Sequence, residues 1–305
     1  MQYYVVSRLA QSFISLIGLV ILVFFMIRMT GNPADLYLPD DVSAAARQAF
    51  IELHRLDDPI ILQFGRFIGD LVHLDLGTSI RQGRSAAVIV LEAYPTSLAL
   101  AAISMSIALV LAILLGVWAA VRPTGVVDRT ISVLSLAGAS APNFWVALTL
   151  ISIFAVGLQL VPTSGIGGWD HWILPVAVLV LRPLGLLSQV VREAVIRSLS
   201  APYIRTARSK GAPDRSILYV HALRNASLPI LTMAGNQAVA FINGSVVIET
   251  IFGFPGVGKL IIDAIVQRDF AVVQAAVIIT ATVIFLLNIV IDLLYALLDP
   301  RIRHS

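Results

Sequence analysis

Residues 97–121, SLALAAISMSIALVLAILLGVWAAV, contain no charged side chain and consist mainly of Leu, Ala and Ile. A helix needs roughly 20 apolar residues to cross a bilayer, because the hydrocarbon core is about 30 Å thick. This stretch therefore predicts a transmembrane helix. Of the 305 residues in the chain, 58% are hydrophobic and only 13% are charged, whereas soluble domains have about 25% charged residues. The whole composition indicates a membrane protein.

Cysteine is absent, which excludes disulfides and thiolate metal sites. The five histidines are scattered, and no two of them are at helical spacing: His54, His73, His171, His221 and His304. We therefore expect no histidine metal site and no histidine acid–base centre. The formal net charge of +3 is small, so the distribution of charge along the chain is more informative than its total.

Five other stretches are long and apolar enough to join residues 97–121 as predicted spans: 9–27, 131–160, 172–191, 225–248 and 270–291. The sequence therefore predicts an all-α polytopic membrane protein with six transmembrane helices. The first stretch is longer than a signal-peptide core and has no evident cleavage site, so we interpret it as a retained anchor.

Charge in the connecting segments predicts the orientation. An even number of spans places both termini on one side, together with the 122–130 and 192–224 segments. That side carries twelve Arg or Lys against four acids, whereas the 31–95 segment has nine acids against five arginines. Because basic residues favour the cytoplasmic side, we predict cytoplasmic termini and place residues 31–95 and 249–269 outside.

Residues 31–95 are too polar to span and too long for a simple loop. Residues 43–56 predict a weak helix. Asp58 is predicted as an N-cap with Pro59 at the first helical position, followed by an apolar stripe over residues 60–72. We expect this second helix to lie on the membrane surface or against the spans. The acidic excess fits either a docking surface or an ordinary solvated segment.

The segment before the fifth span, SAPYIRTARSKGAPDRSILYVHALRNASLP (residues 200–229), predicts two short helices. Pro202 begins the first, Gly211 ends it in the left-handed conformation, and Pro213 begins the second. The basic residues Arg205, Arg208, Lys210 and Arg215 lie on this element. A rigid helical hairpin of this kind suits mechanical contact with a soluble partner.

Polar residues within spans are costly and often mark a translocation path. Asn236 and Asn243 are seven residues apart on one helical face, Asn143 lies in the third span, and Arg182 lies near the middle of the fourth. These four residues either line a pore or, in the case of the amides, hydrogen-bond neighbouring helices. A cargo carboxylate would suit Arg182.

Residues 249–260, ETIFGFPGVGKL, approximate a phosphate-binding loop, with Gly253 followed by Gly258-Lys259. Leu260 replaces the hydroxyl residue that would bind magnesium, no strand precedes the loop, and the predicted side is extracytoplasmic. We therefore reject nucleotide binding here and predict a tight external turn.

Other classes of membrane protein remain alternatives. A stand-alone ion-coupled secondary transporter usually has more spans or visible repeats, and only Glu249 and Asp292 lie near enough to membrane depth to relay protons. A membrane enzyme would require a nucleophile–base or metal-ligand cluster, which the sequence does not suggest. Composition alone does not distinguish a transporter from a channel.

The hairpin carries a resemblance to a known family. Residues Tyr203 to Gly211, His221 to Asn225 and Leu228-Pro229 resemble the "EAA" loop in permease subunits of the peptide/nickel class of ATP-binding-cassette (ABC) importers. The general motif begins Glu-Ala-Ala, whereas this chain has Arg205-Thr206-Ala207, a departure that fits the peptide branch. Further matches occur in the family's order at residues 31–33, 56–59, 75–79, 141–145, 253–258 and 298–303.

The resemblance implies a type I importer permease and, with the spans, four segments. Residues 1–30 form the cytoplasmic N-terminus and first helix, 31–95 an extracytoplasmic helical segment, 96–298 a five-helix core with a coupling loop at 197–226, and 299–305 a cytoplasmic tail. The implied partners are a homologous permease, two cytoplasmic ATPases and an extracytoplasmic substrate-binding protein. ATP and magnesium would bind to the ATPases, with no cofactor or catalytic residue in this chain.

The resemblance also assigns a role to the hairpin. Seven of its residues would contact the ATPase as a coupling helix: Tyr203, Arg205, Thr206, Ala207, Arg208, Lys210 and Gly211. The implied cargo is a di- or oligopeptide, glutathione, an opine or a nickel complex, imported across a bacterial or archaeal cytoplasmic membrane.

Overall fold

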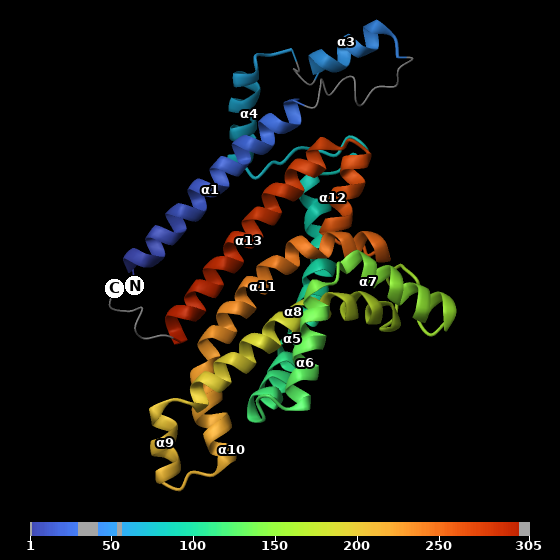
Figure 1. Cartoon of the computed structure of the whole chain (residues 1–305). Helices are drawn as coiled ribbons and strands as arrows, with labels where there is room; N and C mark the ends of the chain where they lie inside the picture. Colours follow the sequence, from blue (N-terminus) through green and yellow to red (C-terminus); the bar gives the residue numbers. More distant parts are fainter. Residues whose placement is uncertain (1, 30–41, 54–56, 299–305) are drawn as a thin grey trace. The chain divides into compact units, whose positions relative to one another are not determined.

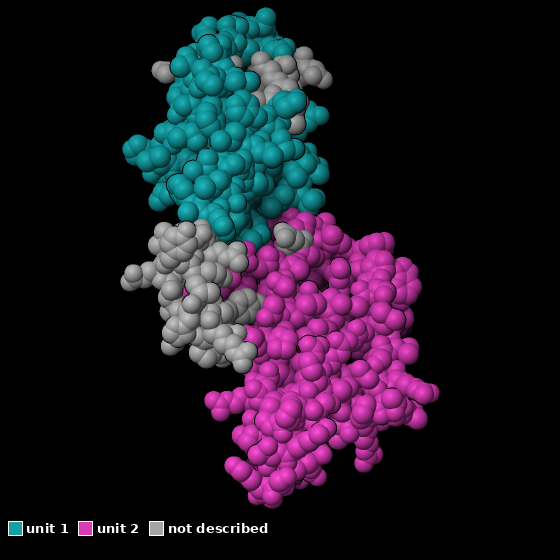
Figure 2. All heavy atoms as spheres, turned by 60° about the vertical axis from the view of Figure 1, so that its left-hand side comes forward, with its two compact units in different colours: residues 1–95, 259–286 teal, residues 96–258, 287–305 magenta. Residues whose placement is uncertain are grey.

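The computed structural model describes residues 2–29, 42–53 and 57–298, and these residues are helical apart from turns and one isolated bridge between Thr78 and Ser85. Their contacts divide the chain into two compact units (Figure 2). The first comprises Met1–Pro95 and Lys259–Leu286, and the second comprises Thr96–Gly258 and Leu287–Ser305. The predictions for residues 31–33 and 299–305 lie outside the described residues.

Three helices are long and apolar enough to cross a membrane: α5 (Ala86–Val121), α8 (Asp170–Leu199) and α13 (Phe270–Leu298) (Figure 1). Two bent helix pairs raise the number to five if each pair is one span. Helix α1 (Gln2–Met29) corresponds to the first predicted span and includes the shorter apolar helix Phe13–Ile27. The chain is therefore an all-helical membrane protein with three to five candidate spans in its described residues, fewer than the six predicted.

The predicted third span, 131–160, is not one straight helix. Helix α6 (Val126–Ser140) ends at Ser140 with Ala141 as its C-cap, and α7 (Asn143–Leu150) with the π-helix η1 (Ile151–Gly157) continues at an angle of 102°. Pro142 causes the break, because proline has no N–H and drives the preceding residue from the helical region. Ala141 accordingly has φ −71° and ψ 130°.

In the first unit, α4 (Ile60–Val72) packs on α1 through aromatic rings. Phe24 stacks on Phe67 with ring centroids 5.3 Å apart and meets Phe64 edge-on at 5.2 Å. The apolar stripe on α4 was thus predicted correctly. The predicted N-cap of α4 was wrong: Pro59 is the N-cap, and the carboxylate of Asp58 forms an ion pair with Arg66. Helix α3 (Ala44–Leu53) matches the weaker predicted helix.

In the second unit, α8 packs against α6 and α11 (Leu223–Phe252). Small residues permit this close approach, as they do in many membrane helix pairs. A Cβ on Gly185 of α8 would lie 2.2 Å from the backbone oxygen of Ser135 of α6, and a Cβ on Gly116 of α5 would lie 2.6 Å from the Cβ of Val191 of α8. An ion pair between Arg192 of α8 and Asp128 of α6 joins the same helices, with Nη2 and Oδ2 2.7 Å apart.

Candidate functional site: a helical hairpin before the fifth span

The hairpin projects beyond the ends of α8 and α11 (Figure 1). It consists of α9 (Pro202–Ser209), a turn at Gly211, α10 (Asp214–Ser216) and the π-helix η2 (Ile217–Ala222), which continues into α11. Pro202 is at the start of α9, as predicted. Gly211 has φ +77°, the left-handed conformation predicted for it. Its N–H donates to Arg208 O at 2.9 Å, and the N–H of Ala212 donates to Ala207 O at 3.1 Å.

A small apolar core fixes the two sides of the hairpin against each other. Ile204 of α9 is 1% exposed and packs with Ile217 and Ala222 of η2, which are also buried, while Leu199 of α8 closes the cluster. The hydroxyl of Tyr203 is hydrogen-bonded to Ser198 of α8. Because both sides are packed and the turn is closed by backbone hydrogen bonds, the hairpin is a rigid element.

The charged side chains of the hairpin point away from this core. Arg205, Arg208, Lys210 and Arg215 are all exposed. The described part of the chain provides no acidic side chain within ion-pair distance of any of them. The structure therefore presents a rigid basic surface whose charges remain available to another molecule.

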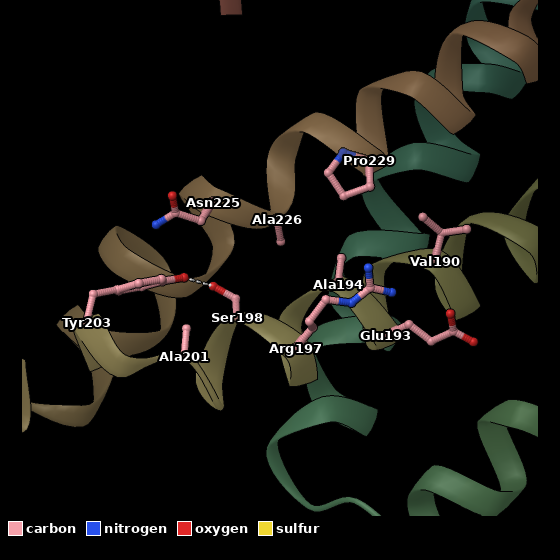
Figure 3. A pocket seen from close by; sticks show the side chains of 10 residues that line it. All are labelled: Val190, Glu193, Ala194, Arg197, Ser198, Ala201, Tyr203, Asn225, Ala226 and Pro229. Carbon is pink, nitrogen blue, oxygen red and sulfur yellow. Dashed lines mark hydrogen bonds between the residues drawn. The ribbon is translucent and has the colours of Figure 1, made fainter. Parts of the chain in front are cut away.

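A pocket of about 390 Å³ lies at the root of the hairpin, between α8, α9 and the start of α11 (Figure 3). Glu193 and Arg197 of α8 lie on one side, and Tyr203 and Asn225 lie on the other. The pocket thus combines an acidic group, a basic group, a hydroxyl and an amide. On the hairpin side, Tyr203 of α9 lines it.

The predicted path residues do not form one cluster. Asn143 begins α7, Arg182 lies in α8 and Asn236 lies in α11, and no hydrogen bond or ion pair joins any two of these three side chains. Arg182 and Asn236 are exposed on the surface of this single chain, and Asn143 is half-buried. The side chain of Asn243 lies outside the described residues. An exposed arginine within an apolar helix requires water or a partner from another molecule.

The ETIFGFPGVGKL segment forms a second ordered site, which we call the Glu249 corner and define as Ser97, Glu249 and residues 253–258. Glu249 is fully buried, and its carboxylate accepts hydrogen bonds from Ser97 Oγ and Gly258 N, both at 2.7 Å. Ser97 Oγ in turn accepts the N–H of Val257 at 2.9 Å. A carboxylate from the chain itself thus accepts a hydrogen bond at the N-terminus of α12 (Val257–Val266), where the helix dipole favours negative charge.

The contact of Glu249 with the turn around Gly256 and Gly258 was not predicted from the sequence. A Cβ at Gly256 would lie 2.4 Å from the Glu249 carboxylate, and one at Gly258 would lie 2.5 Å from Val246 Cα. The close glycine spacing after an isolated acid was the available signal, but it was interpreted as a simple turn. The structure places the ten-residue helix α12 after that turn.

No group of three or more His, Asp or Glu residues within the described ranges is arranged to hold a metal ion.

Comparison with known proteins identifies the family. The model of the binding-protein-dependent transport system inner membrane component matches residues 112–304. The oligopeptide transport system permease protein AppB of Bacillus subtilis is 37% identical, over 100% of both chains. The di/tripeptide transport system permease protein DppB of Pseudomonas aeruginosa is 34% identical, and the glutathione transport system permease protein GsiC of Escherichia coli O6:H1 is 33% identical, each over 99% of both chains.

A solved structure supports the fold. The crystal structure of an amino acid ABC transporter with histidines superposes with a TM-score of 0.53 at 15% identity, covering 70% of this chain and 94% of that chain. At this identity the likeness concerns the fold alone. The family match and the full-length relatives show that the chain belongs to the binding-protein-dependent transport system inner membrane components, as a permease component of an ABC-type importer and not an enzyme.

Proposed function

We propose that this chain forms half of the translocation pathway for di- or oligopeptides, or for a related small cargo such as glutathione, an opine or a nickel complex. The peptide and glutathione permeases that align over nearly their full length support this cargo class. A homologous second permease would form the other half. Two ATPases, holding ATP and magnesium, would bind below, and a substrate-binding protein would deliver cargo from outside.

The rigid basic hairpin is the observation that supports the coupling role. ATP binding changes the permease only if the ATPases contact its two conformations differently. Ile204 and Ile217 make the hairpin stiff enough to transmit such a difference. Arg205 and Arg208 are exposed and have no acidic partner among the described residues. The adjacent pocket offers a recess for a partner side chain.

The proposed function also includes an arrangement of the chain in the membrane. Six spans, with both termini and the hairpin in the cytoplasm, account for the distribution of basic residues. In this arrangement α1 supplies the sixth span and each bent pair crosses once. Residues 31–95 and the Glu249 corner then lie outside, where the binding protein acts.

Charge reversal on the hairpin tests the coupling role. In membranes that contain the assembled importer, the double variant Arg205→Glu/Arg208→Glu should lose ATPase subunits on purification and should no longer support ATP-dependent uptake. Exposed substitutions of this kind usually change stability by less than about 0.5 kcal/mol, so the permease itself should remain in the membrane. Arg122→Glu/Arg129→Glu, at two exposed arginines on the same predicted side of the membrane, is the control matched in charge. Retention of normal amounts of ATPase by the double variant would refute the proposal.

A second experiment tests the path and the cargo. Because Arg182 is exposed within an apolar helix, we propose that it faces the pore and binds a cargo carboxylate. Arg182→Gln should abolish uptake of labelled peptides while the ATPases still co-purify. Parallel assays with glutathione and nickel complexes identify the cargo class, and unchanged peptide transport by the variant would exclude the role of Arg182.

A further inference from the structure

The first unit contains a tightly closed turn just before α5. The N–H of Ser79 donates to Arg84 O at 2.8 Å, and the N–H of Gly83 donates to Ser79 O at 2.8 Å. Ser79 Oγ also accepts the N–H of Gln82 at 3.0 Å. Gly83 has φ +64°, which suits glycine at this position. Residues 79–84 are thus held in one conformation by their own hydrogen bonds.

A buried contact attaches this turn to the connection between α12 and α13. The hydroxyl of Ser79 donates to the carboxylate of Asp269, and the two residues are only 1% and 3% exposed. The other oxygen of Asp269 accepts the N–H of Val272 in the first turn of α13, at 3.4 Å. Arg81 Nε donates to Gln267 O at 3.3 Å. The ends of two candidate spans, α5 and α13, are therefore fixed to each other here.

The two segments present arginine and aliphatic side chains on one exposed surface. Arg81 and Arg268 are exposed and have no acidic partner in the part of the chain that the structure describes, whereas Arg84 pairs with Glu92. Ile80 and Val266 are 44% and 76% exposed. We call residues 80–84 and 265–268 the arginine surface. It is basic although the surrounding segment 31–95 has nine acids against five arginines.

We propose that the arginine surface is the site where an acidic lobe of the extracytoplasmic substrate-binding protein docks. This inference rests on the proposed function, because the outward orientation of residues 31–95 and 249–269 belongs to it. Arginine and aliphatic residues are common at the centre of protein interfaces. A surface that is already rigid loses little conformational entropy on binding, which favours a folded protein over mobile lipid headgroups as its partner.

The buried contact gives such docking a mechanical consequence. A lobe that pulls or tilts the arginine surface acts through Ser79 and Asp269 on the first turn of α13. A second contact lies further along the same helices, where Tyr94 Oη donates to Thr280 Oγ1 at 2.8 Å. Receptor binding at the arginine surface is therefore communicated to two spans at once.

The test uses the assembled importer in lipid nanodiscs with its own binding protein. The double variant Arg81→Glu/Arg268→Glu should lower the association rate of the binding protein by roughly tenfold at low salt, since charge steering acts mainly on association. It should also remove the stimulation of ATP hydrolysis by the binding protein. Arg47→Glu, at an exposed arginine of α3 in the same outer segment, is compared with the single variant Arg81→Glu and controls for one charge reversal outside the arginine surface.

The measurements separate a loss of receptor docking from a failure of the proposed function. ATPase co-purification and basal hydrolysis should remain normal in the double variant, so a loss of receptor binding is distinguishable from a failure of the proposed function. Unchanged association and stimulation would overturn the inference. The inference would also be overturned if the double variant bound the binding protein normally and differed from the unmodified importer only in its thermal stability in anionic lipid. The arginine surface would then bind lipid headgroups. Ser79→Ala provides the second variant: it should leave receptor affinity within about twofold but reduce stimulation.

Discussion

The hairpin and the Glu249 corner both reverse the chain between helices, but different forces stabilise them. The hairpin buries only apolar side chains, such as Ile204 and Ile217, and leaves its charges exposed. The Glu249 corner buries a carboxylate and satisfies it with a hydroxyl and a backbone N–H. A region built to contact a changing partner keeps its charges on the surface. A region that holds the end of α11 and the start of α12 against α5 uses directional bonds, which lose strength quickly when the geometry shifts.

The largest effect is expected from removing the apolar core of the hairpin. Ile217→Ala should cost about 2–5 kcal/mol locally, because it leaves a cavity at a residue that is 2% exposed. Limited proteolysis should then cleave residues 205–210 readily, and ATPase subunits should dissociate. Val220→Ala, in the same π-helix at a 53% exposed residue, should behave like the unmodified protein. Equal protease resistance in both variants would contradict a packed hairpin.

The next effect concerns the buried carboxylate. Glu249→Ala should destabilise the purified subunit by about 3 kcal/mol, because Ser97 and the N–H of Gly258 lose their acceptor inside the protein. The measurement is the thermal unfolding midpoint in detergent. Glu249→Gln should be milder, since its amide oxygen can still accept one bond. If Glu249→Ala unfolds at the same temperature as the unmodified protein, the carboxylate does not hold the corner together.

A somewhat smaller effect should follow from filling the space beside that carboxylate. Gly258→Ala should cost about 2 kcal/mol, because the new Cβ would lie 2.5 Å from Val246 Cα and 2.8 Å from Glu249 Oε2. Gly244→Ala is the control, as nothing lies within 4 Å of a Cβ there and alanine favours a helix. The prediction is wrong if the two alanine variants have the same unfolding midpoint.

The smallest effect is expected at the turn of the hairpin. Gly211→Ala meets no atom within 4 Å, so its cost is only that of a left-handed backbone, about 1 kcal/mol. ATPase co-purification should persist, with partly reduced coupling of hydrolysis to uptake. Gly211→Asn should be closer to normal, because asparagine tolerates this conformation better. Complete uncoupling by Gly211→Ala would indicate a direct contact between the glycine and a partner.

Much of the hairpin could be predicted from its sequence because its signals are local. Pro202 begins a helix, Gly211 permits the left-handed turn, and Ile204 and Ile217, which pack together, are only thirteen residues apart in the chain. Asp58 shows the limit of local signals: it was assigned as an N-cap, but its carboxylate instead binds Arg66. Capping and ion pairing compete for such a side chain, and sequence alone does not decide between them.

The amino-acid sequence by itself determined that this is a helical membrane protein with a basic hairpin before its fifth predicted span, because apolar length, charge distribution and turn residues act locally. Only the tertiary structure determined the sharp bend at Pro142, the burial of Glu249 on Ser97 and Gly258, and the contact of Ser79 with Asp269. Partners such as Ser79 and Asp269 are 190 residues apart in the chain, and only packing of the helices determines which distant groups meet.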